Sequence, residues 1–105
     1  MDKYEHHRYM IRAATFQARN WIRDMIRMDS TIRNKFYAYG DLIDIMEDCR
    51  EGPNFAKFTQ WIMYAEELIA ELLKVKLSPP NESNKFAVIG RIEESINYLQ
   101  LEIPL

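Results

Sequence analysis

The sequence predicts a single all-α domain over residues 1–105, a four-helix up-down antiparallel bundle with a long first helix. Three observations lead to this prediction. Apolar residues recur at intervals of three and four along most of the chain, the spacing that aligns side chains on one face of a helix. Three glycines and four prolines are few, so long helices and short loops are expected. The connections between the first three helical segments are short, which favours antiparallel neighbours.

The first helix is expected over residues 3–28, a stretch without glycine or proline. Its apolar stripe consists of Tyr4, His7, Ile11, Ala14, Ala18, Trp21, Met25 and Met28. Asp29 and Ser30 then end the helix, and a side-chain oxygen at this point can cap the next one.

The second helix carries the stripe Ile32, Phe36, Tyr39, Ile43 and Met46. Gly40 lies inside it and costs up to about 1 kcal/mol relative to alanine, so this position allows a kink, with Asp41 available as a fresh cap. The segment ends at Glu51-Gly52-Pro53, because proline cannot continue a helix.

The third helix should begin after Asn54, a natural N-cap. Its stripe is Phe55, Phe58, Ile62, Ala65, Ile69, Leu72 and Lys76, widened by Trp61, Leu68 and Val75. A stripe of this width predicts the most buried helix of the four.

Residues 77–84 are expected to form a loop, because Pro79-Pro80 favours extended backbone. A shorter fourth helix follows over 85–99, with Ile89, Ile92, Ile96 and Leu99 facing the core and Gly90 either allowing close packing or loosening the first turn. Residues 100–105 are expected to be irregular. At 1.5 Å per residue the first helix measures about 39 Å and the last about 23 Å, so the first should overhang the bundle. Either the tail or a second copy of the chain should cover the overhang, and we expect a homodimer.

The composition fits a soluble cytoplasmic protein. The single Cys49 excludes an internal disulfide and suits a reducing compartment, and neither a signal-peptide pattern nor a membrane-length apolar run is present. The net charge of −2 is unevenly distributed, because residues 1–40 hold eight Lys/Arg against four Asp/Glu and residues 41–105 hold six against twelve.

No catalytic pattern stands out, and we expect neither an enzyme nor a cofactor. His6 and His7 are adjacent, so on a helix they point about 100° apart and cannot readily share a metal ion. Ser30 and Ser83 look like helix caps, and the three glycines are too far apart for a phosphate-binding loop. Cys49 has only Arg50 as a basic neighbour, which does not favour a reactive thiolate.

Two groups of acids suggest an alternative. Asp41, Asp44, Asp48 and Glu51 share one face of the second helix, and Glu66, Glu67 and Glu71 lie on the third. Through Asp48-x-x-Glu51 and the Glu66–Glu71 stretch, the chain resembles the all-α nucleoside triphosphate pyrophosphatases of the MazG type. The resemblance implies a Mg²⁺-dependent phosphohydrolase, although Glu67 and Glu71 are four residues apart where the family has three. The other interpretation is a solvated acidic face, with no metal.

The most informative surface feature is a set of arginines within a sector of about 100° on the first helix, with two aromatic residues at its edge. We predict that these residues bind a partner: Arg8, Tyr9, Arg12, Phe16, Arg19, Arg23 and Arg27. Arginine and aromatic side chains are enriched at protein interfaces and also serve nucleic acids. A third interpretation pairs the arginines with the acidic helices of the same chain.

We therefore predict a small helical protein–protein interaction module, a regulator or inhibitor that acts by binding a partner protein. The alternatives are a nucleic-acid-binding accessory protein that uses the arginines of the first helix, and the Mg²⁺-dependent phosphohydrolase. The pI of about 5.7 favours the protein partner, since nucleic-acid-binding domains usually have a pI above about 9.

Overall fold

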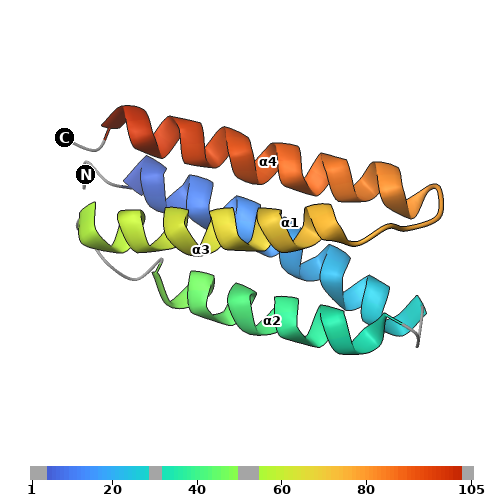
Figure 1. Cartoon of the computed structure of the whole chain (residues 1–105). Coiled ribbons are helices and arrows are strands. Elements are labelled where there is room, and N and C mark those ends of the chain that lie inside the picture. The colour runs from blue at the N-terminus through green and yellow to red at the C-terminus, as the bar shows by residue number, and fades with distance from the viewer. Residues whose placement is uncertain (1–4, 29–31, 50–54, 103–105) are drawn as a thin grey trace.

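Four helices account for nearly all of the computed structural model, which describes residues 5–28, 32–49 and 55–102. They are α1 (Glu5–Met28), α2 (Arg33–Asp48), α3 (Phe55–Lys74) and α4 (Asn81–Glu102) (Figure 1). Of the described residues 92% are helical and none lies in a strand, which confirms the predicted all-α four-helix bundle.

The helices alternate in direction along the bundle (Figure 1). α1 packs against α2 and α4, and α3 packs against the same two helices, so α1 and α3 are diagonal to each other. The beginning of α1 and the end of α4 therefore lie at the same end of the molecule, which measures 44 × 22 × 20 Å. Within the described ranges, no helix combines the length and the apolar content needed to cross a lipid bilayer.

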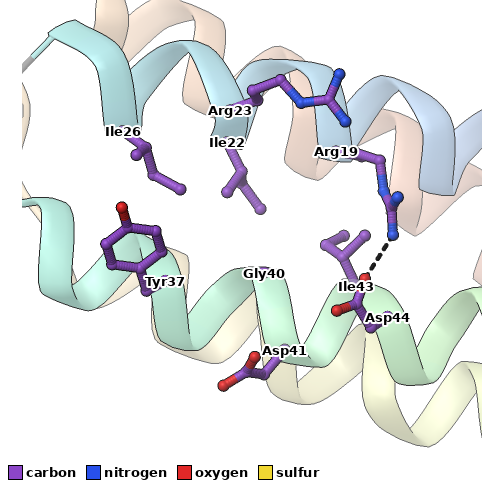
Figure 2. Close-up of a pocket in the computed structure, with 9 residues that line it drawn as sticks. All are labelled: Arg19, Ile22, Arg23, Ile26, Tyr37, Gly40, Asp41, Ile43 and Asp44. Atoms are coloured by element: carbon purple, nitrogen blue, oxygen red, sulfur yellow. Dashed lines mark hydrogen bonds and ion pairs between the residues drawn. The ribbon is translucent and has the colours of Figure 1, made fainter.

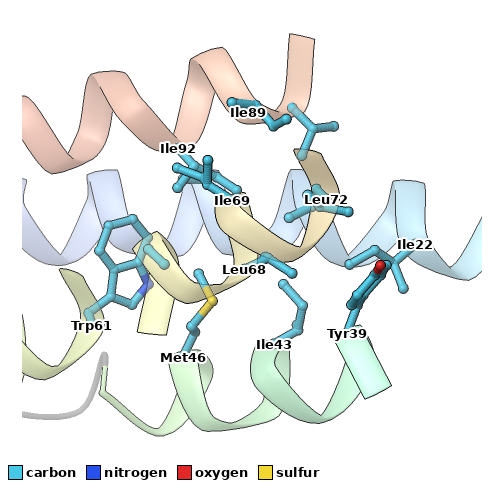
Figure 3. Packing of buried hydrophobic residues seen from close by; sticks show 14 of the residues in the cluster. Ile22, Tyr39, Ile43, Met46, Trp61, Leu68, Ile69, Leu72, Ile89 and Ile92 are labelled. Carbon is cyan, nitrogen blue, oxygen red and sulfur yellow. The ribbon is translucent and has the colours of Figure 1, made fainter. Parts of the chain in front are cut away.

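The core is built from the apolar stripes of all four helices. Phe36, Phe58 and Trp61 are fully buried, and each large side chain of this kind stabilises the fold by about 1.5–3 kcal/mol. Figure 3 shows Leu68 of α3 directed toward α2 and Ile69 toward Ile92 of α4. The helix with the widest apolar stripe thus fills the space between its two neighbours.

A hydrogen bond between two buried side chains crosses this core. The Thr15 hydroxyl donates to the carbonyl oxygen of Ile11 at 2.6 Å and accepts a hydrogen bond from Trp61 Nε1 at 3.0 Å. Thr15 and Trp61 are both buried, and their hydrogen bond links the diagonal helices α1 and α3.

The fourth helix differs most from the prediction. α4 begins at Asn81 and ends at Glu102, so it has 22 residues, close to the 24 of α1. Pro79-Pro80 does not delay the helix, because a residue in the first turn needs no amide hydrogen for the intrahelical ladder. The Glu82 N–H donates to the carbonyl oxygen of Ser78 at 3.2 Å and the Asn84 N–H to that of Pro80 at 3.1 Å, so the helical hydrogen bonds include both sides of the Pro79-Pro80 pair.

The predicted overhang of the first helix is therefore wrong. Ile11, Ala14, Ala18 and Met25 are buried within the single chain. Met28, predicted in the stripe, has 65% of its surface exposed. The expected dimer consequently needs a different surface from the one that the helix lengths indicated.

Smaller differences concern helix ends and glycines. Ile32 occupies the N-cap position of α2 without a side-chain hydrogen bond, and Asp29 and Ser30 lie outside the described residues. α2 continues through Gly40, and Asp41 starts no new helix. Lys76 is exposed beyond the end of α3, and Gly90 is exposed rather than closely packed. The remaining predictions, on Tyr4, Glu51-Gly52-Pro53, Asn54 and 103–105, lie outside the described residues, as does the side chain of Phe55.

Candidate functional site

The seven residues predicted to bind a partner lie on one side of α1, and we call them the α1 surface. Tyr9 and Phe16 have 61% and 62% of their surface exposed. Arg12, Arg23 and Arg27 are exposed, whereas Arg8 and Arg19 are half-buried. The structure therefore places both aromatic rings and three guanidinium groups where a partner can reach them.

Arg19 is held within the chain. Its Nη2 atom lies 2.6 Å from Asp44 Oδ1 and 2.9 Å from Glu47 Oε2, so two carboxylates of α2 share one guanidinium group. The intramolecular interpretation of the arginines is thus correct for Arg19. Glu47 lies outside the acidic face that the sequence pattern indicated, and for that reason the sequence did not single it out.

Unlike Arg19, three other arginines of α1 are not held by carboxylates of the described residues: Arg12, Arg23 and Arg27. None of the three forms an ion pair or a hydrogen bond with any residue that the structure describes. Arg23 lies one helical turn after Arg19 and still remains uncompensated.

A groove runs between α1 and α2 beside Arg19 and Arg23. It has a volume of about 270 Å³, and Ile22, Ile26 and Ile43 form its apolar floor (Figure 2). Its other lining residues are Arg19, Arg23, Tyr37, Gly40, Asp41 and Asp44. The basic residues belong to the α1 wall and the acidic residues to the α2 wall, so the two walls carry opposite charges.

Gly40 and Tyr37 complete the groove on the side of α2. A Cβ atom added at Gly40 would meet nothing within 4 Å, so the backbone of α2 is open to the groove at this point. Tyr37 has 56% of its surface exposed. The sequence signal for Tyr37 was an aromatic residue outside the apolar stripe of the second helix, the same signal that identified Tyr9 and Phe16.

The acids of this set that the structure describes do not come together, and Glu51 lies outside the described residues. The Tyr39 hydroxyl donates to the backbone carbonyl of Glu71 at 3.2 Å, which fixes the register of α2 and α3. Asp48 lies nine residues after Tyr39 on α2, about 14 Å along the helix at 1.5 Å per residue, and is therefore far from Glu71. Glu66 faces α4, where it lines a separate depression with Glu93. Among the described residues, no group of three His, Cys, Asp or Glu side chains could hold a metal ion.

The two histidines contact aromatic rings, and the single cysteine is buried. The His7 ring is buried and stacks on Phe58 at 5.4 Å, and the exposed His6 meets the edge of the Tyr98 ring at 5.0 Å. Burial raises the pKa of the Cys49 thiol, which disfavours the thiolate.

Comparison of the chain with protein-family models, curated proteins and solved structures finds no match. Function is therefore inferred from the groove and the α1 surface themselves.

Proposed function

We propose that this protein is a protein–protein interaction module, a regulator or inhibitor that acts by binding a partner protein through the α1 surface. The observation that supports this most is the exposure of Tyr9 and Phe16 beside the uncompensated Arg12. Aromatic and arginine side chains bury large areas and contribute most of the energy at many interfaces. Tyr9 stacks on His6 at 6.2 Å, but the exposed part of the two rings contributes no packing energy to the fold.

Charge compensation favours a protein partner over nucleic acid. A protein gains affinity for nucleic acid when its cationic side chains contact phosphates and release the counterions bound there. Arg19 contributes little to such binding, because Asp44 and Glu47 already neutralise it. Asp41 on the facing wall of the groove would repel a phosphate backbone. A phosphohydrolase activity receives less support, since Asp48 and Glu71 lie too far apart to share a Mg²⁺ ion.

A capture experiment with matched variants tests the protein partner. The double variant Tyr9→Ser/Phe16→Ser removes both exposed rings, and Met63→Ser/Leu73→Ser removes two residues of α3 with similar exposure, 55% and 54%. In a nuclease-treated extract of the native host, the first variant should lose at least about tenfold of the captured protein, equivalent to about 1.4 kcal/mol. The α3 variant should capture as the wild type does, and both should melt at temperatures close to that of the wild type.

Two outcomes would contradict this proposal. Equal capture by wild type and Tyr9→Ser/Phe16→Ser would remove the α1 surface from the function. Retention of the wild type on DNA or RNA, weakening linearly with the logarithm of the salt concentration, would favour the nucleic-acid alternative.

We also propose that the protein forms homodimers and acts in the cytoplasm. A buried free thiol at Cys49 fits a reducing compartment. Light scattering at micromolar concentration should give about twice the chain mass of 12.6 kDa. A mass of one chain at millimolar concentration would contradict the dimer.

A further inference from the structure

We propose that two copies of the chain dock through the groove between α1 and α2, about a two-fold axis parallel to the helices. In this arrangement α1 of each copy lies over α2 of the other. The inference rests on the proposed self-association, and it specifies the surface and the symmetry.

The charges of the groove walls provide the first argument. Arg23 on α1 and Asp41 on α2 line the same groove but extend from opposite walls and away from each other (Figure 2). Both are exposed, and neither forms an ion pair with another residue in the described part of the chain. A face with one basic and one acidic edge is complementary to a second copy of itself in a suitable orientation.

Symmetry selects that orientation. An isologous dimer needs a two-fold axis within the plane of the interface, and the axis can run along the groove or across it. An axis across the groove would place α1 on α1 and bring arginine against arginine. An axis along the groove places α1 on the partner's α2, so that basic and acidic walls meet twice in one dimer.

The register between α1 and α2 then identifies the pair that meets. Arg19 lies beside Asp44, and α1 and α2 are antiparallel, so four residues later Arg23 lies level with Gly40 and Asp41. A two-fold axis along the groove leaves this level unchanged. Arg23 of one copy therefore faces Asp41 of the other.

The apolar part of the face is compatible with the same arrangement. Tyr37 is more than half exposed at the groove, and symmetry brings the two Tyr37 rings to the same level, over the floors formed by Ile22 and Ile26. The missing side chain at Gly40 leaves room on α2 for the side chain of Arg23 from the other copy, which lies at the same level. The net charge of −2 is small, so repulsion between copies is weak.

Two charge reversals test the proposal. The variants Arg23→Glu and Asp41→Arg each bring like charges together twice per dimer, and each should raise the dissociation constant of the dimer at least about tenfold, equivalent to about 1.4 kcal/mol. An equimolar mixture of the two should restore association, because the new glutamate faces the new arginine while the unchanged Arg23 faces the unchanged Asp41. Sedimentation velocity at micromolar concentration measures all three samples.

Two controls distinguish a loss of association from a loss of folding and from a general effect of changing a surface charge. Thermal melts of both variants should match the wild type under conditions that favour the monomer, since neither side chain is paired with a described residue of its own chain. Lys76→Glu and Glu94→Arg, exposed and outside the groove, should dimerise as the wild type does.

Each remaining outcome overturns the proposal in a distinguishable way. If Arg23→Glu and Asp41→Arg still dimerise as the wild type, self-association uses another surface. If each variant is monomeric and the mixture is monomeric as well, Arg23 of one copy does not face Asp41 of the other. A strictly monomeric wild type contradicts both this inference and the dimer, whereas partner capture through Tyr9 and Phe16 is measured separately and can still hold.

Discussion

Arg19 and Arg23 are one turn apart on the same helix, yet their surroundings differ. Arg19 points from α1 toward α2 and is held by two carboxylates, whereas the side chain of Arg23 does not turn toward α2 (Figure 2). The difference follows from their positions around the helix, about 40° apart at 100° per residue. One arginine therefore belongs to the fold, and the other is available to a partner.

We predict that Arg19→Glu destabilises the monomer by about 1 kcal/mol, because its carboxylate would face Asp44 and Glu47. Arg23→Glu should leave the free energy of unfolding unchanged within a few tenths of a kcal/mol. Urea unfolding at low protein concentration and low salt measures both, and the loss for Arg19→Glu should shrink in high salt. Equal effects of the two reversals would contradict the different roles assigned to these arginines.

The sequence predicts the composition of the α1 surface but not the pairing of its members. A helical pattern gives the angle of Arg19 around α1, whereas its partners depend on the register between α1 and α2. Glu47 lies outside the predicted acidic face, but one turn of α2 places it beside Asp44, so both carboxylates reach Arg19. The groove could not be predicted for the same reason, since its two walls come from different helices.

At the level of elements, the start of α4 is fixed by a polar network. Lys85 is buried, and its Nζ atom donates to the carbonyl oxygen of Val75 and to Glu82 Oε1, both at 2.8 Å. The other carboxylate oxygen of Glu82 accepts the N–H of Leu77 at 2.8 Å. The network ties the end of α3 and the connecting segment to the first turn of α4.

This network predicts a pH dependence of stability. The hydrogen bond from Lys85, and then that from the Leu77 N–H, lower the pKa of Glu82 below its ordinary value of about 4.3. A carboxylate whose pKa is lower in the folded state stabilises the fold above the unfolded pKa, and this contribution is lost as the pH falls through the folded pKa.

Glu82→Gln should therefore be less stable than the wild type at neutral pH, and the difference should diminish as the pH falls below about 4. Urea unfolding over this range measures the difference. Glu94→Gln, a change on the exposed side of the same helix, serves as the control. A difference for Glu82→Gln that does not vary with pH would show that the ionised carboxylate is not what stabilises the start of α4.

Helix positions follow from the sequence more directly than helix ends. Periodicity located all four helices, because burial of one face at a 3.6-residue period leaves a strong pattern. The start of α4 was missed, because Pro79-Pro80 is equally compatible with extended backbone and with a first turn. Lys85, expected at the start of the helix, is instead a buried residue one turn inside it. Its burial depends on Val75 and Glu82, which periodicity does not describe.

For the whole molecule, the question is what determines the order of the helices around the bundle. Apolar stripes favour burial but do not by themselves decide which helix lies diagonally opposite which. The hydrogen bond from Trp61 to Thr15 joins α1 and α3 across the core. It can form only when each of the two helices is rotated about its own axis so that these side chains face each other. We infer that this pair contributes to the specificity of the bundle as well as to its stability.

We predict that Thr15→Val costs about 1–3 kcal/mol although it keeps the shape of the side chain, because the buried indole N–H of Trp61 loses its acceptor. In the background of Trp61→Phe, which has no N–H to satisfy, the same substitution should cost close to nothing. Urea unfolding of wild type, both single variants and the double variant closes a double-mutant cycle and isolates the coupling between α1 and α3. An equal cost of Thr15→Val in both backgrounds would mean that the hydroxyl acts only through Ile11 within α1, and that its hydrogen bond with Trp61 does not help to order the four helices.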